Sequence, residues 1–505
     1  MTFSLINSIN PYNLPLHMPF EDLHEFLDYL EKNEELKRVK VEVSPDLEVS
    51  EIANRVMKIN GNALLFEKVK GSKIPLAMNL FGTWKRMCAV LGVEDPIKIG
   101  ERIAKTMRPK IPETVMEAIS LLKDFKKILG YPPKVVAKGK CKEIIIEKPN
   151  LGLLPIIKCW PKDGGKYITL PLVITKDPVT KVRNVGMYRM QVFDEKTCGM
   201  HWQIHKHGAS HYRKFIEQSS TFRDSDSKKM EVAVALGCDP ITIFSAVAPL
   251  PENVDEFMFA GFLREKRLNL VKCETIELEV PANAEIILEG YVDLNELKLE
   301  GPFGDHTGYY SLEDLYPVFH IICMTMRADA IYPSTIVGYP PMDDTQLGIA
   351  VERIFLPIIR LQFPEIVDIN LPVHACFHNL AIVSIKKSYP GQAQKVMFGL
   401  WAMGQLMFTK IIVVVDNDVN VHDMNEVLWA LTTRIDPKRD IILIDKAPAD
   451  SLEFASNLPN LSSKMGIDAT RKSKDEGFTG RWPEKTVMTD DIKKLVNKRW
   501  QEYGL

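Results

Sequence analysis

The run Ile411-Ile-Val-Val-Val415 contains five consecutive β-branched residues and no polar side chain. A strand with one face in water alternates apolar and polar residues, whereas a strand covered on both faces is apolar throughout. Helical patterns precede the run at 392–408 and follow it at 423–433. Strands joined by helices in this way form a parallel sheet with helices on both faces. The run therefore predicts an α/β domain.

Two further strand-like runs, 381–385 and 441–444, extend this pattern on either side. We assign both to the same parallel sheet, in a C-terminal α/β domain over residues 331–485. A terminal helix follows in residues 486–505, and its apolar stripe must pack against this chain or another. We predict that it contacts another subunit. The stripe consists of Ile492, Leu495, Val496 and Trp500.

Upstream, the dominant pattern is one of short β runs separated by glycine and proline. Many short strands with this punctuation indicate a barrel or a sandwich, and we place this domain at 126–330. Helices are expected near 212–217 and 254–267. The runs assigned to strands include 172–175, 241–244, 276–280 and 319–325.

The first 125 residues mix helical and strand patterns, which predicts an N-terminal α/β domain over 1–125. Leu23, Phe26, Leu27 and Leu30 share one face of a predicted helix. A second helix is expected at 50–57 and a strand at 63–66. Prolines and lysines between 109 and 150 mark the expected boundary with the central domain.

Composition excludes several classes of protein. The chain has 505 residues, 46% of them hydrophobic, and its net charge of −2 gives no field that would attract nucleic acid. Its eight cysteines are scattered without a Cys-x-x-Cys pair, which favours free thiols over a zinc site or a disulfide scaffold. No secretory signal is evident, and no apolar run approaches the ~18 residues of a membrane span. We therefore expect a cytoplasmic protein.

The segment Glu300-Gly-Pro-Phe-Gly-Asp305-His-Thr-Gly-Tyr-Tyr310 places two carboxylates five residues apart in a turn. Proline and glycine make a helix unfavourable here, so the turn can direct both acids into one cavity. Acid pairs whose pKa values are pushed apart perform general acid and base catalysis. The alternative is a charged turn on the surface.

A second polar segment holds four of the eleven histidines: His201, His205, His207 and His211. The spacing of His201 and His205 fits one helix face, whereas that of His205 and His207 fits a strand. The segment is therefore either a ligand site or a solvated basic loop. Two more histidines, His374 and His378, are assigned to packing.

Six motifs occur in a fixed order along the chain, and together they resemble the UbiD family of reversible decarboxylases. They are Asn184-x-Gly-x-Tyr-Arg189, His205-Lys-x-Gly-Ala209, Pro249-Leu-Pro-Glu-Asn-Val-Asp-Glu256, Glu289-Gly-Tyr291, the turn 300–310, and Ser463-Lys-Met-Gly-Ile-Asp-Ala-Thr470. The resemblance covers almost the whole chain. It implies that the central domain is a split β-barrel like that of flavin reductases.

The resemblance further implies prenylated FMN as cofactor, held through Mn²⁺ or Mg²⁺ and through K⁺. Asn184, His205 and Glu256 match the family's metal ligands, and oxygen and imidazole donors suit such ions. Thr169 and Lys410 match residues that touch the cofactor phosphate. Arg434 matches a residue near the K⁺ site, or alternatively forms a salt bridge at a helix end. The cofactor-binding residues also include Val185, Gly186, Met187, Tyr188 and Arg189.

Arg189, Glu300 and Asp305 match the family's catalytic network. Loss of CO₂ from an aryl carbon leaves charge that a cofactor must accept, and an acid must then protonate that carbon. The resemblance implies that Glu300 is this acid, that Arg189 pairs with the incoming carboxylate or with Glu300, and that Asp305 holds Arg189. Burial raises the pKa of an acid and a nearby cation lowers it, so the protonation state of Glu300 stays open.

The implied reaction is reversible decarboxylation of a hydroxylated aromatic acid, such as a hydroxybenzoate or naphthoate of ubiquinone or menaquinone biosynthesis. Asp305, His306 and the segment 159–161 favour that branch of the family. Alternatives are a carboxylase, a degradative decarboxylase of phenolic or polycyclic acids, and an inactive flavin-binding protein. The implied partners are a flavin prenyltransferase that supplies the cofactor and further copies of the chain in dimers or hexamers. A polyprenylated substrate would add peripheral membrane contact.

Overall fold

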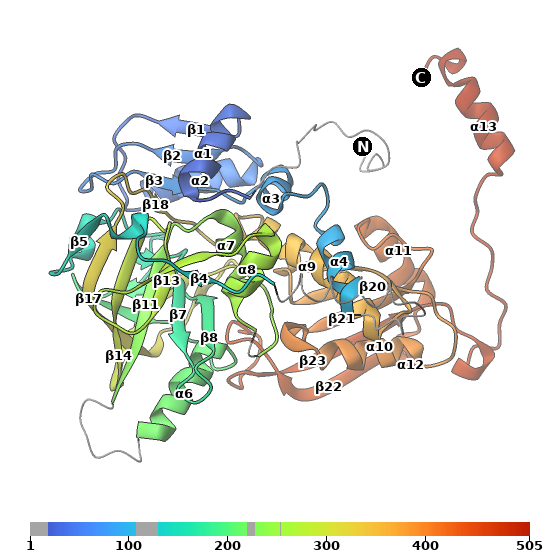
Figure 1. Ribbon diagram of the computed structural model, residues 1–505. Coiled ribbons are helices and arrows are strands. Elements are labelled where there is room, and N and C mark those ends of the chain that lie inside the picture. Colours follow the sequence, from blue (N-terminus) through green and yellow to red (C-terminus); the bar gives the residue numbers. More distant parts are fainter. Residues whose placement is uncertain (1–18, 108–129, 220–227, 253) are drawn as a thin grey trace, which may run out of the picture.

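The described residues form three larger sheets and two small ones with helices around them, a mixed α/β architecture (Figure 1). The computed structural model describes residues 19–107, 130–219, 228–252 and 254–505. Much of the expected boundary at 109–150 lies outside these ranges. Among the described helices, none is both long and apolar enough to cross a bilayer.

The N-terminal sheet has four strands in the order β1-β2-β3-β18, and the last of these comes from far along the chain. Helix α1 packs on the core through the predicted face, with Leu23 and Phe26 buried, and Asp22 caps its first turn by accepting a hydrogen bond from the Glu25 amide. The elements are α1 (Leu23–Lys32), β1 (Leu36–Val39), α2 (Glu48–Lys58), β2 (Ala63–Phe66), β3 (Leu76–Met78), α3 (Trp84–Leu91), α4 (Ile97–Met107) and β18 (Tyr332–Pro333).

The central sheet has nine strands in the order β6-β9-β10-β17-β14-β11-β7-β8, with β5 paired to β17. No described strand joins β6 to β8, so the sheet is an open half-barrel. Both faces are covered, because neighbouring residues such as Leu172 and Val173 belong to different apolar clusters. The strands are β5 (Ile144–Ile146), β6 (Tyr167–Ile168), β7 (Leu172–Lys176), β8 (Arg183–Met187), β9 (Met190–Val192), β10 (Thr197–Met200), β11 (Lys229–Leu236), β14 (Ile286–Glu300) and β17 (Asp314–Met326).

Two of the strand predictions in this domain need correction. Residues 241–244 lie in helix α7 (Pro240–Ser245), because Asp239 accepts a hydrogen bond from the Thr242 amide and Pro240 occupies the first turn. Of the run 276–280, only the last two residues enter a strand, β13 (Glu279–Pro281). The predicted helices are present as α6 (His207–Ser219) and α8 (Glu256–Arg264).

The remaining central strands are short and form two small sheets. They are β4 (Lys134–Val135), β12 (Asn269–Lys272), β15 (Phe303–Gly304) and β16 (Tyr310–Ser311). Strands β4, β12 and β13 form a three-stranded sheet, and β15 pairs with β16.

The C-terminal sheet has the order β19-β20-β21-β23-β22. Its three middle strands are parallel, which confirms the prediction of parallel strands at 381–385 and 411–415. The prediction of a parallel strand at 441–444 is wrong, because β22 runs antiparallel to β23. The elements are α9 (Asp344–Gln362), β19 (Ile366–Asn370), β20 (Leu380–Ile385), α10 (Gln392–Trp401), β21 (Ile411–Asp416), α11 (Met424–Arg434), α12 (Pro437–Asp440), β22 (Ile441–Pro448) and β23 (Leu461–Ala469).

Consecutive residues of the parallel strands point to opposite faces of this sheet. Val414 packs in a cluster with Met397 of α10, whereas Val413 packs in a cluster with Val427 of α11. A helix therefore covers each face, as the unbroken apolar runs predict.

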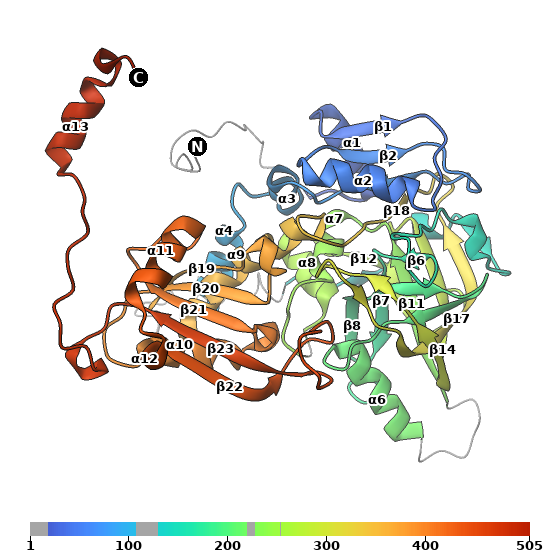
Figure 2. The same cartoon turned by 180° about the vertical axis from the view of Figure 1, so that it is seen from behind.

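The terminal helix α13 (Asp490–Lys498) stands apart from the body of the chain in both views (Figures 1 and 2). The apolar side chains of α13 and of the turn that follows it are largely in solvent, with Ile492 41%, Leu495 48% and Trp500 49% exposed. The described part of this chain therefore leaves the predicted stripe uncovered.

Candidate active site

Glu300 and Asp305 flank a turn that lies at the end of the long β14–β17 hairpin. Glu300 is the last residue of β14, and Asp305 follows β15. Two side chains hold the turn: Gln191 accepts a hydrogen bond from the Gly301 amide (2.7 Å), and Asp163 accepts one from the Gly304 amide (2.8 Å). Both carboxylates are buried, which excludes the surface-turn alternative.

Arg189 lies between the two acids, as the resemblance implied. It follows β8, and its Nε donates to Glu300 Oε1 (3.0 Å) while its Nη1 pairs with Asp305. Nη2 donates to Glu300 Oε2 (3.2 Å) and to Ser311 Oγ (3.0 Å), and the guanidinium covers the ring of Phe303. The cation is thus fixed on several sides, and its charge faces two buried carboxylates.

His201 is a fourth member of this cluster, and the sequence did not single it out. Its Nδ1 lies 3.0 Å from Glu300 Oε2, and its ring packs against Tyr316 with 4.3 Å between ring centroids. The group of four histidines was the only signal for it. Nothing in the spacing relates His201 to an acid 99 residues away.

The cluster keeps both acids ionised. Burial alone would raise the pKa of Glu300, but the hydrogen bond from His201 and the charge of Arg189 lower it to about 2. Burial is likewise outweighed at Asp305, where His306 and Arg189 hold the pKa well below its usual range. The hydrogen bonds and nearby cations therefore lower the pKa values of both acids more than burial raises them, which the sequence alone could not decide. An acid-catalysed step requires that Glu300 first gain a proton.

Asp305 also connects the site to the C-terminal domain. Its Oδ1 accepts a hydrogen bond from His306 Nδ1 (2.9 Å), and His306 Nε2 lies 2.8 Å from Nε2 of His378. Burial would lower the pKa of His306, but Asp305 raises it, so His306 donates. Burial lowers the pKa of His378 to about 4, so this ring is neutral and accepts. The assignment of His378 to packing was therefore incomplete, because it forms a hydrogen bond between domains.

A second constellation lies at the other end of β8. Asn184 on this strand and Glu256, the first residue of α8, are buried beside one cavity, and Glu256 Oε2 accepts a hydrogen bond from the Val185 amide (2.8 Å). Burial raises the pKa of Glu256 to about 8. A cation at this point would offset the cost of ionising it. The cavity is lined by Arg183, Asn184, His207, His211, Glu252 and Glu256, among others.

The imidazole that lines this cavity together with Asn184 and Glu256 belongs to His207, and the assignment of His205 as a metal ligand stays a prediction. His207 is the first residue of α6 and lines the cavity. His205 lies in the preceding turn, is exposed, and faces Phe408 with 5.2 Å between ring centroids. An amide oxygen, an imidazole and a carboxylate fit a Mn²⁺ or Mg²⁺ ion.

The other predicted cofactor residues have partners within the protein. Thr169 Oγ1 lies 2.9 Å from Ser334 Oγ and accepts a hydrogen bond from the Thr335 amide, and Lys410 Nζ pairs with Glu453 at 2.6 Å. Neither Thr169 nor Lys410 lines the cavity beside Asn184. Val185, Gly186 and Met187 form the rest of strand β8, and Tyr188 OH accepts a hydrogen bond from the Gly208 amide (3.4 Å).

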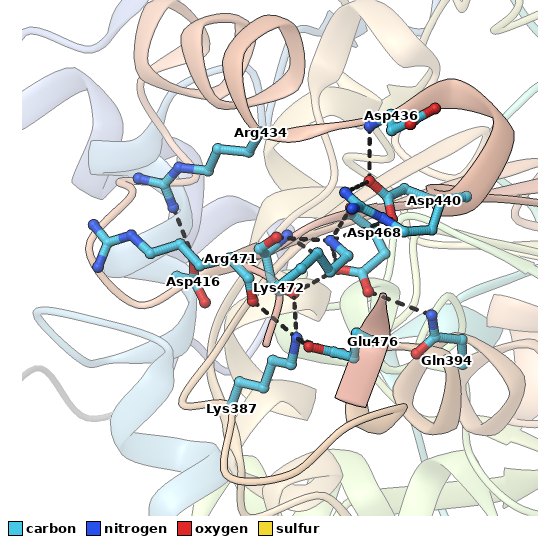
Figure 3. A network of polar contacts seen from close by, with 12 residues as sticks. Lys387, Gln394, Asp416, Arg434, Asp436, Asp440, Asp468, Arg471, Lys472 and Glu476 are labelled. Atoms are coloured by element: carbon cyan, nitrogen blue, oxygen red, sulfur yellow. Dashed lines mark hydrogen bonds and ion pairs between the residues drawn. The ribbon is translucent and has the colours of Figure 1, made fainter. Parts of the chain in front are cut away.

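Arg434 belongs to a separate polar network at the end of the C-terminal sheet (Figure 3). Its guanidinium pairs with Asp416 (2.9 Å) and Asp418 (3.0 Å), where helix α11 ends. The network includes buried Lys472, which donates to the carbonyls of Asp468 and Thr470. Arg434 therefore forms the helix-end salt bridge that was the alternative to an ion site.

Family models match three successive parts of the chain. All describe 3-octaprenyl-4-hydroxybenzoate carboxy-lyase: its N-terminal domain at residues 27–107, its Rift-related domain at 134–340, and its C-terminal domain at 345–469. A protein of Archaeoglobus fulgidus, described only as uncharacterized, is 55% identical over 96% of this chain and 99% of its own length.

Solved structures give the same result. The UbiD-class enzyme HmfF from Pelotomaculum thermopropionicum, in complex with FMN, is 30% identical with a TM-score of 0.76, covering 94% of this chain and 99% of its own. An evolved dimeric form of HmfF was solved in complex with prFMN. Vanillic acid decarboxylase from Sedimentibacter hydroxybenzoicus, in its closed form, is 29% identical with a TM-score of 0.82, covering 96% and 99%. From end to end, the chain is a member of the UbiD family of carboxy-lyases, which are decarboxylases.

Proposed function

We propose that this enzyme uses prenylated FMN to remove CO₂ reversibly from a hydroxylated aromatic acid. The main observation in favour is Arg189, a buried cation held between two ionised carboxylates. HmfF has been solved with FMN and with prFMN, and vanillic acid is a hydroxylated aromatic acid. Binding of a flavin alone would not require two buried acids around an arginine, because burial of charge is costly. This cost argues against an inactive flavin-binding protein.

Cofactor binding is assigned to the cavity beside strand β8. Asn184, His207 and Glu256 would hold Mn²⁺ or Mg²⁺, and through it the cofactor phosphate. Thr169, Lys410 and a K⁺ ion are proposed to complete the phosphate site, and Lys410 would then exchange Glu453 for a phosphate oxygen. When bound, prenylated FMN supplies the electron sink for the charge that departing CO₂ leaves.

The catalytic steps are assigned to the Arg189 cluster. Arg189 would bind the carboxylate of the incoming acid through the N–H groups that now reach Glu300, and Asp305 would keep the guanidinium in place. Glu300 would lose part of its stabilising contacts in that exchange, so its pKa would rise. A protonated Glu300 would then deliver its proton to the ring carbon that has lost CO₂. At high CO₂ the same steps run in reverse as carboxylation.

The preferred substrates are phenolic acids, including the hydroxybenzoates and naphthoates of quinone biosynthesis. The support for this preference is the resemblance carried by Asp305, His306 and the segment 159–161; in the structure His306 donates to Asp305, and Trp160 packs against Gly304. A terminal helix with an uncovered apolar stripe supports assembly of the enzyme into homo-oligomers, with α13 packed on a second copy.

The deciding experiment is expression of the chain beside a flavin prenyltransferase. We expect prenylated FMN and Mn²⁺ or Mg²⁺ to copurify, and the holoenzyme to release CO₂ from phenolic acids in a panel of aryl acids. Mass spectrometry of the released ligand and a CO₂ assay measure the two results. Cofactor without turnover on any acid would favour a binding protein, and absence of the flavin would contradict the proposal.

A further inference from the structure

His201 joins the catalytic acid to a nitrogen atom that has no protein partner. It follows strand β10, and its side chain is only 9% exposed. Nδ1 lies 3.0 Å from Glu300 Oε2, whereas Nε2 is buried without a hydrogen-bond partner among the residues that the structure describes. Buried polar atoms are almost always hydrogen-bonded, so a bound ligand or water is expected to serve Nε2.

The surroundings of His201 determine where its proton lies. Burial, and then the charge of Arg189, lower the pKa of His201, although Glu300 and Asp305 oppose them. Tyr316 also faces the ring, and burial raises the pKa of this phenol to about 12, so it carries no charge. The imidazole is therefore neutral near pH 7. Because Glu300 is ionised, the single proton of the ring lies on Nδ1 and is donated to Oε2.

Glu300 needs a source of protons, because the structure holds it as a carboxylate. Its side chain receives hydrogen bonds from Arg189 and His201. Arg189 cannot release a proton, because its neighbouring acids raise a pKa that is already far above neutrality. His201 can release one, since imidazole exchanges protons through both nitrogen atoms.

We propose that His201 is a positioning residue that passes to Glu300, through the Nδ1–Oε2 contact, the proton that Glu300 then delivers to the substrate carbon. The inference rests on the function proposed above. Nε2 accepts a proton from water or from a phenolic hydroxyl, which keeps the electron pair as hydroxide or phenolate. The Nδ1–H bond breaks, and that proton forms the carboxylic acid of Glu300. His201 stays neutral with its proton on Nε2, and exchange with solvent restores the first tautomer.

The variant His201→Asn separates positioning from proton transfer. Its amide nitrogen replaces Nδ1 and can still donate to Glu300, but an amide cannot relay a proton. His320→Asn is the control for a histidine–glutamate pair elsewhere on the same hairpin, because His320 contacts Glu296 through Nε2. The assay follows exchange of the ring hydrogen of guaiacol, the product from vanillic acid, by the holoenzyme in D₂O.

We expect His201→Asn to slow exchange about 100-fold at pH 7, and the control to change it less than twofold. Exchange by His201→Asn should then rise about tenfold per pH unit on acidification, because Glu300 takes protons directly from solvent. The wild-type rate should vary little over that range. A His201→Asn enzyme that exchanges at the wild-type rate, with the wild-type pH profile, would overturn the proposal.

A second measurement does not depend on activity. In cofactor-free protein with ¹⁵N-labelled histidine, the His201 signals, identified by their loss in His201→Asn, should show a neutral ring protonated on Nδ1 at pH 7. A proton on Nε2 instead would overturn the proposal. If the wild-type holoenzyme exchanges no ring hydrogen of the phenol and releases no CO₂ from the panel of acids, the proposed function fails. The NMR measurement then still tests whether His201 donates its proton to Glu300 through Nδ1.

Discussion

Two adjacent glycines allow a matched test of how closely the catalytic turn must be placed. The amide of Gly164 donates to Pro302 O (2.8 Å), and a Cβ atom on Gly164 would lie 2.0 Å from Gly301 O. Carbon and oxygen atoms that are not bonded need more than about 3 Å, so the turn must move by roughly 1 Å in Gly164→Ala. Overpacking of this kind costs about 1–3 kcal/mol, and a 1 Å displacement of catalytic groups costs about 100-fold in rate.

Gly165→Ala provides the control, because its Cβ would make only ordinary contacts, with the Gln191 amide nitrogen at 3.5 Å and Val192 O at 3.6 Å as its nearest neighbours. We expect Gly164→Ala to lower the midpoint of urea unfolding and to reduce CO₂ release about 100-fold, whereas Gly165→Ala stays within twofold of wild type. Both variants are compared as holoenzyme with equal flavin content. Equal turnover by the two variants would refute the claim that the position of this turn controls catalysis.

Four further predictions follow from the same sites. Glu300→Gln should leave the flavin spectrum intact and reduce CO₂ release at least 100-fold, and near-normal release would remove Glu300 from the role of acid. Mn²⁺ binds the ionised form of Glu256, and the pKa of Glu256 is about 8. The affinity for Mn²⁺ should therefore be highest above pH 8 and fall about tenfold per pH unit below it. Calorimetry in two buffers should detect the release of about one proton on Mn²⁺ binding at pH 7. His207→Ala should lose both metal and flavin, while His205→Ala retains them. Metal analysis and the flavin absorbance of the purified proteins test this, and the opposite pattern would assign the ligand to His205. Truncation before residue 490 should reduce the oligomeric mass in light scattering, and an unchanged mass would assign the apolar stripe to another role.

The sheet of the C-terminal domain could be predicted because the side chains of its central strands show by their apolar character that both faces are covered. An unbroken apolar run such as 411–415 is stable only between two apolar layers. The run 441–444 looks the same in sequence but lies antiparallel at the edge, because strand direction depends on the connection and not on the side chains. Residues 241–244 have a strand-like composition, but the Asp239-Pro240 pair before them starts a helix.

The candidate site was predictable only in part, and for a different reason. Arg189, Glu300 and Asp305 were found through ordered motifs, and the structure brings all three into contact. His201 and His207 were not selected, since four nearby histidines look equivalent until the fold gives each a neighbour. The helix that begins at His207 places this residue in the lining of the cavity beside Asn184, and the strand that ends at Met200 leaves the next residue beside Glu300. A closer likeness of the central sheet to flavin-reductase barrels stays a prediction.

The hydrogen bond between His306 and His378 makes the chemistry dependent on the assembled state of two domains. The two Nε2 atoms lie 2.8 Å apart, so a relative displacement of the two domains by about 1 Å would break this hydrogen bond. His306 would then lose the neighbour that orients it toward Asp305. Asp305, in turn, would no longer be held in position to pair with the guanidinium of Arg189. A displacement of the two domains relative to each other would therefore lower the activity without changing any residue of the catalytic cluster.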